Sequence, residues 1–352
     1  GGLRHVERFM KHYFLVARDV GTLTRILCAG LEARQMKEAP VFGRSQTGSA
    51  TGAPGEIAEA PAFRLDGGRV NLRAATAFAG DPVNLMRLFA VAGRLGAGIH
   101  PDALKVARRS LALVRPTVCV SGEANAIFLE LLTGRGDPET ILRAMNEAGV
   151  LGRFIPEFGR VVAMMQFNMY HHFTVDEHLI RTVGVLAAIE SGALAEDHPL
   201  AASIFPTLTG RRALYVAALL HDIAKGRKEH HAIAGARIAE ELCPRLGLAA
   251  DETETVAWLI RHHLLMSETA QMRDLTDAKT IQDFASVVQS RERLKLLLIL
   301  TVADIRAVGP GVWNGWKGQL LRTLYAEAEL VLSGGHGALA DRKSTRLNSS
   351  HR

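Results

Sequence analysis

The apolar positions of this chain recur mostly at the three- and four-residue spacing of an amphipathic helix. From Val6 to Met36 they follow this spacing with charged residues between them, and nothing within this stretch alternates as a strand would. We therefore expect one long helix there. After Asp81-Pro82 the same spacing resumes in several runs, each ended by Gly or Pro. The pattern predicts an array of helices through the middle of the chain.

Two stretches depart from the helical pattern. Residues 44–62 collect Gly, Ser, Thr, Ala and Pro, which is the composition of a flexible loop. In the segment FRLDGGRVNL, Asp66-Gly67 separates two short alternating runs, which indicates a hairpin. The predicted fold class is therefore all-α, with at most one short β-hairpin near residues 63–72.

The length and the distribution of histidine suggest two domains. A single core rarely grows to 352 residues, so we expect the chain to divide. Histidine becomes frequent after Pro156, which places a functional domain at 157–335 and a helical region at 1–156. The end of the chain, ADRKSTRLNSSHR, has no apolar periodicity, so residues 336–352 look non-native and are excluded from function.

Composition and charge exclude several classes of protein. No apolar stretch approaches the roughly 20 residues of a membrane-spanning helix. The three cysteines are widely spaced and odd in number, so a disulfide framework or a cysteine zinc site is not expected, and a cytoplasmic location fits. The net charge of +6 falls to +3 without the basic tail, and no basic stripe is present, so nucleic acid is not an expected partner.

The chemistry centres on the motif YVAALLHDIAKGR. Its apolar run places His221 and Asp222 at the end of a buried helix, where a charge requires a partner. His178 begins the amphipathic segment HLIRTVGVLAAIE, and Asp304 interrupts the apolar segment LKLLLILTVADI. Two imidazoles and two carboxylates from three helices form a mixed nitrogen and oxygen set suited to Mn²⁺, Mg²⁺, Fe²⁺ or Zn²⁺. Such a site activates water for hydrolysis.

Each of these residues also has a structural interpretation. His221 and Asp222 could form a buried ion pair, His178 could be a polar residue at a helix N-terminus, and Asp304 could be a buried hydrogen-bonding group. In that case Asp222 would be satisfied by backbone or Arg donors. A shared metal instead requires the four side chains to converge. Separation of Asp304 from His221 by more than about 8 Å would exclude a common ion.

The order His, His-Asp and distant Asp resembles the HD phosphohydrolase superfamily, which has a helical-bundle fold and hydrolyses phosphate esters. Four segments, MYHHFTVDEHLIRT, ALLHDIAKGR, HHLLMSETAQMRDLTD and LTVADIRAVGPGVWNGWKGQLLRTLY, resemble the uridylyl-removing region of the bifunctional enzymes that modify PII nitrogen-signalling proteins. The opening MKHYFLVARDVGTLTRILCAGLE is similar to the helical region that follows the nucleotidyltransferase core of that family. Asn168, where an acid is expected, and Lys228-Glu229-His230, in place of a Gly/Asp-rich turn, depart from its pattern.

The resemblance implies a role for each matching residue. His178, His221, Asp222 and Asp304 match the HD metal ligands. His231 and His263 match positions that serve a second ion or a proton transfer, with His262 as an alternative to His263. Lys225 and Arg227 follow the HD pair closely enough to reach a phosphoryl group, although a helix C-terminus also favours basic residues.

The implied activity is removal of UMP from a tyrosine of uridylylated PII, with Mn²⁺ or Mg²⁺ as the expected metal. The resemblance also implies a central fragment, in which the nucleotidyltransferase core precedes residue 1 and is absent here. Two alternatives remain open. The chain could be a stand-alone HD phosphohydrolase acting on free nucleotides, or a non-enzymatic helical docking module that binds no metal.

Overall fold

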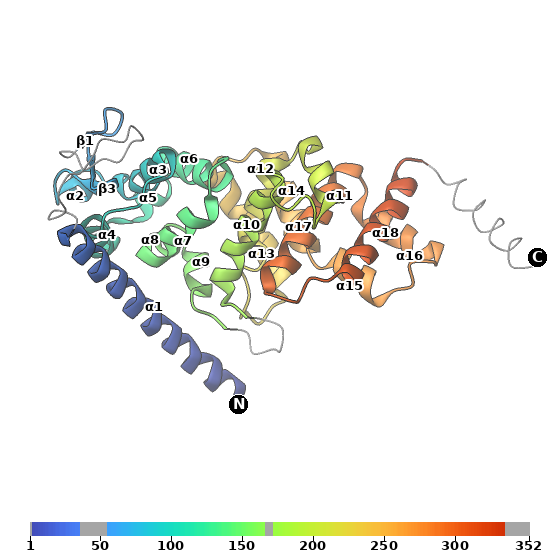
Figure 1. Ribbon diagram of the computed structural model, residues 1–352. Coiled ribbons are helices and arrows are strands. Elements are labelled where there is room, and N and C mark those ends of the chain that lie inside the picture. Colours follow the sequence, from blue (N-terminus) through green and yellow to red (C-terminus); the bar gives the residue numbers. More distant parts are fainter. Residues whose placement is uncertain (1, 36–54, 166–171, 335–352) are drawn as a thin grey trace, which may run out of the picture. The chain divides into compact units, whose positions relative to one another are not determined.

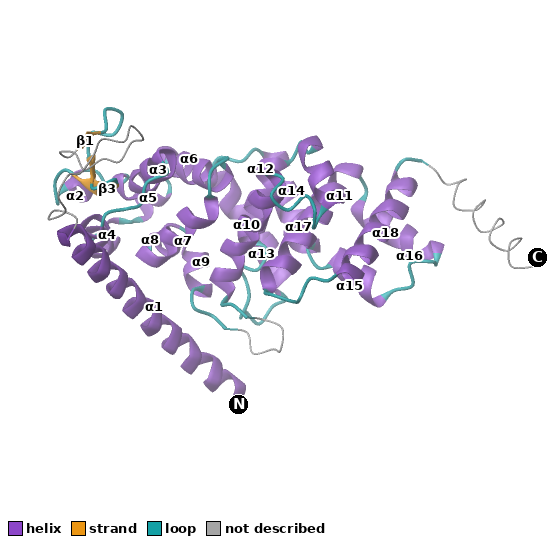
Figure 2. Ribbon diagram, viewed as in Figure 1, coloured by secondary structure: helices purple, strands orange, loops and turns teal. Residues whose placement is uncertain are grey.

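The computed structural model describes residues 2–35, 55–165 and 172–334, and Figure 2 shows that these residues form helices joined by loops, with one small sheet. The predicted all-α class is confirmed. Residues 44–54 of the predicted loop, Asn168 and the tail 336–352 lie outside the described residues. Among the described helices, none has a stretch that is both long enough and apolar enough to span a lipid bilayer.

The chain divides into two compact units. Unit 1 contains Gly1–Phe167, Thr174–Ile180 and Arg245–Gly247, and unit 2 contains Asn168–Phe173, Arg181–Pro244 and Leu248–Arg352. Helix α10, Val175–Glu190, runs without interruption through one of these boundaries, so its start is assigned to unit 1 and the rest to unit 2. The predicted domain division at residue 156 stays a prediction.

Unit 1 begins with the long helix that the apolar spacing predicts, α1 (Gly2–Gln35). Most of the other elements of unit 1 are labelled in Figure 1, and all of them have these bounds: β1 (Gly55–Glu56), β2 (Phe63–Asp66), β3 (Arg69–Leu72), α2 (Ala77–Gly80), α3 (Asn84–Leu95), α4 (Pro101–Arg109), the 3-10 helix η1 (Leu111–Leu113), α5 (Pro116–Cys119), α6 (Gly122–Thr133), α7 (Pro138–Ala148), α8 (Val150–Phe154) and α9 (Pro156–Val161). Helix α3 packs against α6 and α7. Phe128 and Phe154 are fully buried there, with ring centroids 5.4 Å apart.

The predicted hairpin is formed by β2 and β3, which pair antiparallel from Phe63 opposite Leu72 to Asp66 opposite Arg69. The turn between them places Gly67 and Gly68 at φ +57° and +74°, the left-handed region that a two-residue hairpin turn favours. Strand β1 adds a third antiparallel strand to β2, within the segment expected to be a loop. Two residues are too few to show an alternating pattern, so periodicity could not have predicted β1.

Unit 2 is a bundle in which α12 packs against both α14 and α17. Its elements after α10 have these bounds: α11 (Pro199–Ile204), the 3-10 helix η2 (Phe205–Thr207), α12 (Arg211–Leu220), α13 (His231–Leu246), α14 (Ala250–His262), α15 (Leu265–Met272), α16 (Ala278–Val288), α17 (Arg291–Val308) and α18 (Gly315–Leu332). Every residue of α12 from Ala213 to Leu220 is buried. A short helix that is apolar on all sides belongs in a core, so α12 is the central element of this unit.

A partly buried polar network fixes the start of α12. Glu190, the last residue of α10, accepts hydrogen bonds from Arg211 Nε and Nη2 at 2.6 and 2.8 Å and from the Tyr215 hydroxyl at 2.7 Å. Tyr215 is fully buried. Burial and, as a smaller cause, the nearby Glu190 carboxylate raise the pKa of its hydroxyl, which therefore remains a donor at neutral pH. A bidentate Arg–carboxylate pair is directional. The network therefore holds α12 against α10 at the end opposite the His221-Asp222 pair.

The burial of α13 predicts how the cysteines react. Cys243 on α13 is buried, and burial raises the pKa of its thiol to about 12, whereas Cys28 is exposed. Only the thiolate is nucleophilic. We expect iodoacetamide at pH 8 to alkylate Cys28 in the folded protein and Cys243 only after unfolding in guanidinium, as measured by peptide mass spectrometry. Equal rates at the two sites in the folded protein would contradict the burial of α13.

Candidate metal centre

The His221-Asp222 pair lies where α12 ends, and both side chains are almost inaccessible, with 0% and 3% of their surfaces exposed. His221 Nδ1 is 2.9 Å from the carbonyl oxygen of Ala218. Because a carbonyl oxygen only accepts hydrogen bonds, Nδ1 carries the proton and Nε2 carries the lone pair. The backbone therefore fixes the tautomer in which Nε2 is the nitrogen able to ligate a metal.

His263 repeats this arrangement at the end of α14. Its Nδ1 lies 2.7 Å from the carbonyl oxygen of Ile260, which again leaves the lone pair on Nε2. The ring centroids of His221 and His263 are 5.2 Å apart. The ends of α12 and α14 thus bring two imidazoles of the same tautomer into one buried site.

The carboxylate of Asp222 connects the surrounding groups. Its Oδ2 lies 2.5 Å from Lys225 Nζ and 3.6 Å from His221 Nε2. Its Oδ1 lies 3.5 Å from His231 Nε2 and 3.8 Å from His263 Nε2. Each oxygen therefore faces a different set of nitrogen atoms, and Asp222 lies between His221 on one side and the two later histidines on the other.

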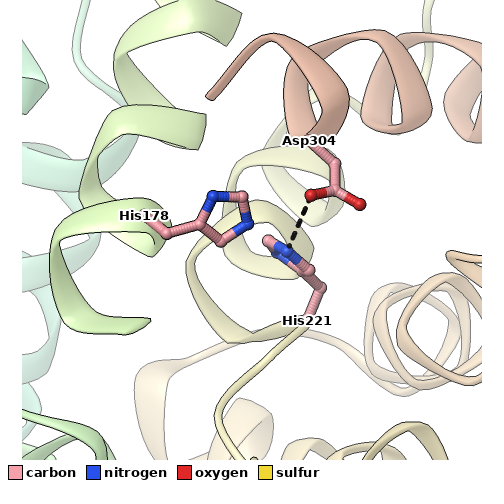
Figure 3. Close-up of side chains that lie close together, drawn as sticks. All are labelled: His178, His221 and Asp304. Atoms are coloured by element: carbon pink, nitrogen blue, oxygen red, sulfur yellow. Dashed lines mark ion pairs between the residues drawn. The ribbon is translucent and has the colours of Figure 1, made fainter. Parts of the chain in front are cut away.

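Asp304 reaches the same place from α17. Its Oδ1 is 3.5 Å from His221 Nε2, well inside the limit of about 8 Å that the single-ion interpretation requires. His178, near the start of α10, offers a ring nitrogen within 4.8 Å of the ligand atoms of both residues. Figure 3 shows the three side chains directed toward one another from separate helices, with the His221–Asp304 pair marked by a dashed line.

Within the described residues, two groups of three potential ligands meet the spacing of a metal site. One contains His178, His221 and Asp304, and the other contains Asp222, His231 and His263, with ligand atoms in each group no more than 4.8 Å apart. Donors that share a divalent cation at roughly 2.0–2.3 Å lie within about 4.6 Å of one another, so both groups are close to that arrangement. Asp222, which the sequence places with His178, His221 and Asp304, falls in the second group, although its Oδ2 is also 3.6 Å from His221 Nε2. The single four-ligand set stays a prediction.

The electrostatics of the histidines suit a cation. Burial alone would lower the pKa of His221, but the carboxylates of Asp222 and Asp304 outweigh it and raise that pKa. The potential at His221 is therefore negative, which attracts positive charge. Burial and the neighbouring His221 lower the pKa of His263 to about 4, and burial is the largest cause that lowers the pKa of His231. Both rings are consequently neutral at pH 7, the form that binds metals.

The remaining predicted residues are placed differently. Lys225 is 11% exposed and pairs with Asp222, whereas Arg227 is exposed and no described side chain pairs with it. His262 packs beside Trp258, with ring centroids 5.0 Å apart, and belongs to neither ligand group. The structure thus distinguishes His263 from its neighbour. Residues 228–230, where the sequence departs from the family pattern, are exposed.

Sequence reasoning missed Arg181. It follows His178 by three residues on α10, so the two side chains share one helix face. Its guanidinium lies 4.1 Å from the ring centroid of Phe173, and its buried Nε has no hydrogen-bond partner among the described residues. The three-residue spacing from His178 was the available signal, because it places a cation one turn from a candidate ligand.

Comparison with known families agrees with this geometry. Residues 63–154 match the family model described as uridylyltransferase GlnD third domain, and residues 175–308 match that of the HD domain. The second match begins at the first residue of α10 and ends at the last residue of α17. It therefore contains every candidate ligand from His178 to Asp304.

The close packing of α13 behind the site gives a testable prediction. A Cβ on Gly235 would lie 2.9 Å from Ile260 Cγ2, closer than side-chain atoms approach. Because the Ile260 carbonyl orients His263, Gly235→Ala should displace that imidazole and lower the free energy of unfolding by about 1–3 kcal/mol. Chemical denaturation would measure this change.

The matched control is Gly122→Ala on α6, where a Cβ meets no atom within 4 Å. It should leave stability unchanged or slightly raised, because Ala favours helix. Equal effects of the two substitutions would show that α13 does not pack tightly against α14.

Proposed function

Because the chain belongs to the family of GlnD-type PII uridylyltransferase/uridylyl-removing enzymes, we propose that its HD domain hydrolyses the phosphodiester between UMP and a tyrosine of PII. The products are free UMP and unmodified PII. In this reaction water adds to phosphorus, the bond from phosphorus to the tyrosine oxygen breaks, and the tyrosine takes up a proton. The HD domain is that of a metal-dependent phosphohydrolase.

The single observation that carries this proposal is the convergence of His221 and Asp304, 3.5 Å apart although they lie on different helices. With Asp222, His231 and His263 beside them, the site gathers more ligands than a structural ion pair needs. The Lys225–Asp222 pair alone would suit a structural role. The two ligand groups around it favour a metal centre over the docking-module alternative.

We propose that His178, His221 and Asp304 hold one divalent cation and that Asp222, His231 and His263 hold a second. Bound cations would supply positive charge beside the phosphoryl oxygens and lower the pKa of water, both of which hydrolysis requires at neutral pH. Mixed nitrogen and oxygen ligands suit Mn²⁺ or Mg²⁺, with Fe²⁺ or Zn²⁺ as further candidates.

The chain's own residues orient this chemistry. Lys225 holds the Asp222 carboxylate through Oδ2, so that Oδ1 faces His231 and His263. Backbone carbonyls fix the rings of His221 and His263. Such preorganised groups need not rearrange during the reaction. The leaving tyrosinate, with a pKa of about 10, is a moderately good leaving group and needs little assistance.

We further propose that Arg181 and Arg227 supply positive charge for the substrate. Arg181 has no acidic partner among the described residues and lies one turn from His178, and Arg227 is exposed a few residues beyond the HD pair. An arginine that is not engaged by a carboxylate can pair with a phosphodiester oxygen.

The partner and the location are part of the same proposal. The match to a GlnD third domain over residues 63–154 favours uridylylated PII as substrate over a free nucleotide. Neither nucleic acid nor a membrane is expected. Three cysteines without disulfides fit a cytoplasmic location.

Metal content tests the ligand assignment. His263→Ala should lower the Mn²⁺ bound per chain, measured by elemental analysis after dialysis, from two ions to one. The adjacent His262→Ala is the matched control and should retain both ions, because His262 packs against Trp258. Equal metal content in the two variants would contradict the second ion site.

Activity tests the function. The chain with Mn²⁺ should release UMP from uridylylated PII, and His221→Ala or Asp222→Ala should reduce the rate to background while circular dichroism stays helical. A folded Asp222→Ala variant that releases UMP at the parent rate would show that this site is not the hydrolytic centre. Parent protein that hydrolyses a nucleoside triphosphate but not uridylylated PII would support the stand-alone alternative.

A further inference from the structure

The first turn of α10 is held by α7 through two neighbouring acidic residues. Asp176 is 4% exposed, and its Oδ2 accepts a hydrogen bond from Asn146 Nδ2 at 2.8 Å. The next residue, Glu177, pairs with Arg143 at 2.6 Å. Arg143 and Asn146 are three residues apart on α7, so they lie on one face of that helix. We call these two pairs the α7–α10 clamp.

The Asp176 carboxylate is also bonded from the chain before α10. Its Oδ1 accepts a hydrogen bond from the Ala163 backbone N–H at 3.0 Å. Ala163 is buried and has φ +56°, a left-handed conformation that a residue other than glycine keeps only where its surroundings enforce it. Both oxygens of Asp176 are therefore bonded, and the carboxylate has one defined orientation.

Stabilisation of α10 does not by itself explain why Asp176 is buried. A carboxylate in the first turn of a helix interacts favourably with the helix dipole even when it is exposed, whereas burial costs free energy. Lys11 on α1 is close enough to offset part of this cost, because burial lowers the pKa of its ammonium and the Asp176 carboxylate acts in the opposite direction. A buried charge with specific partners adds little net stability, and its best-attested role is to select one arrangement of the chain.

The arrangement that the clamp selects is the direction of His178. Asp176 and His178 are two residues apart on one helix, so their side chains point about 200° apart. Asp176 bonds to α7, and Figure 3 shows His178 directed toward His221 and Asp304. A rotation of this turn that displaced Asp176 would therefore move the His178 imidazole away from the other two ligands.

We propose that Asp176 and Asn146 are positioning residues for the metal centre, which fix the first turn of α10 on α7 and so aim His178 at the first ion. The inference rests on the proposed ion site of His178, His221 and Asp304. Asn146 lies in the segment that matches the GlnD third domain and Asp176 in the segment that matches the HD domain, and both belong to unit 1. The third-domain segment thus contributes to the metal chemistry without supplying a ligand.

The experiment is a calorimetric titration of the full 352-residue chain with Mn²⁺. Asn146→Leu removes the donor at similar volume and should weaken one of the two ions about 10–100-fold, the loss that follows removal of a group that orients a ligand. The other ion should be unaffected, because Asp222, His231 and His263 do not lie on α10. Weakening of both ions alike, or of neither, would overturn the proposal.

Two further variants separate the loss of this hydrogen bond from general damage to unit 1. The reversed pair, Asn146→Asp with Asp176→Asn, keeps one donor and one acceptor and should bind both ions as the parent chain does. Asn125→Leu is the matched control: Asn125 is 2% exposed in the same unit, and its Nδ2 donates at 2.8 Å to the carbonyl oxygens of Cys119 and Ser121. It should leave both affinities unchanged. A reversed pair as weak as Asn146→Leu, or an equal loss in Asn125→Leu, would contradict positioning through the clamp.

Amide hydrogen exchange of the metal-free chain separates this inference from the proposed activity. Exchange of residues 175–180 should be about tenfold faster in Asn146→Leu than in the parent chain, because loss of the hydrogen bond lowers the free energy of opening that turn. Equal rates would show that Asn146 does not hold α10, whatever metal the chain binds. A parent chain that binds no Mn²⁺ would instead contradict the proposed metal centre, even with the clamp intact.

Discussion

The burial of the Asp222 carboxylate is the constraint on which the rest of the site depends. A carboxylate that is 3% exposed at the end of an apolar helix is costly unless positive or hydrogen-bonding groups surround it. Lys225 compensates one oxygen, and the other faces two imidazoles. These groups come from the turn after α12, from α13 and from the end of α14. The packing of these three helices must therefore bring together the groups that compensate the charge of Asp222.

The helices that carry this site are positioned by ordinary apolar packing and by one polar network. Helix α12 is buried on all sides and contacts α14 and α17, which carry His263 and Asp304 at their C-terminal ends. The Glu190–Arg211–Tyr215 network fixes its start. Because α12 is held at its N-terminal end and along its length, the HD pair at its C-terminal end has a defined position. Rigid helices hold ligands more accurately than loops do.

The two units of the chain bury polar groups in different ways. Unit 1 buries polar side chains that bond to one another, as where Asn146 Nδ2 donates to Asp176 Oδ2 at 2.8 Å. Unit 2 concentrates ionisable groups in its interior, where low polarity strengthens each electrostatic interaction. A buried ionic cluster of that kind requires a counter-charge or a metal.

The sequence alone determined the helical class, the long first helix, the β2–β3 hairpin and the candidate ligands, because these depend on local spacing and on the identity of neighbouring residues. Periodicity is a short-range property, and Asp66-Gly67 specifies a turn without help from distant parts. Only the tertiary structure decided that Asp222 groups with His231 and His263, that His263 rather than His262 faces it, and that Lys225 pairs with it while Arg227 is exposed. Two adjacent histidines at a helix end differ by about 100° in direction, and sequence spacing cannot say which of them meets a carboxylate on another helix.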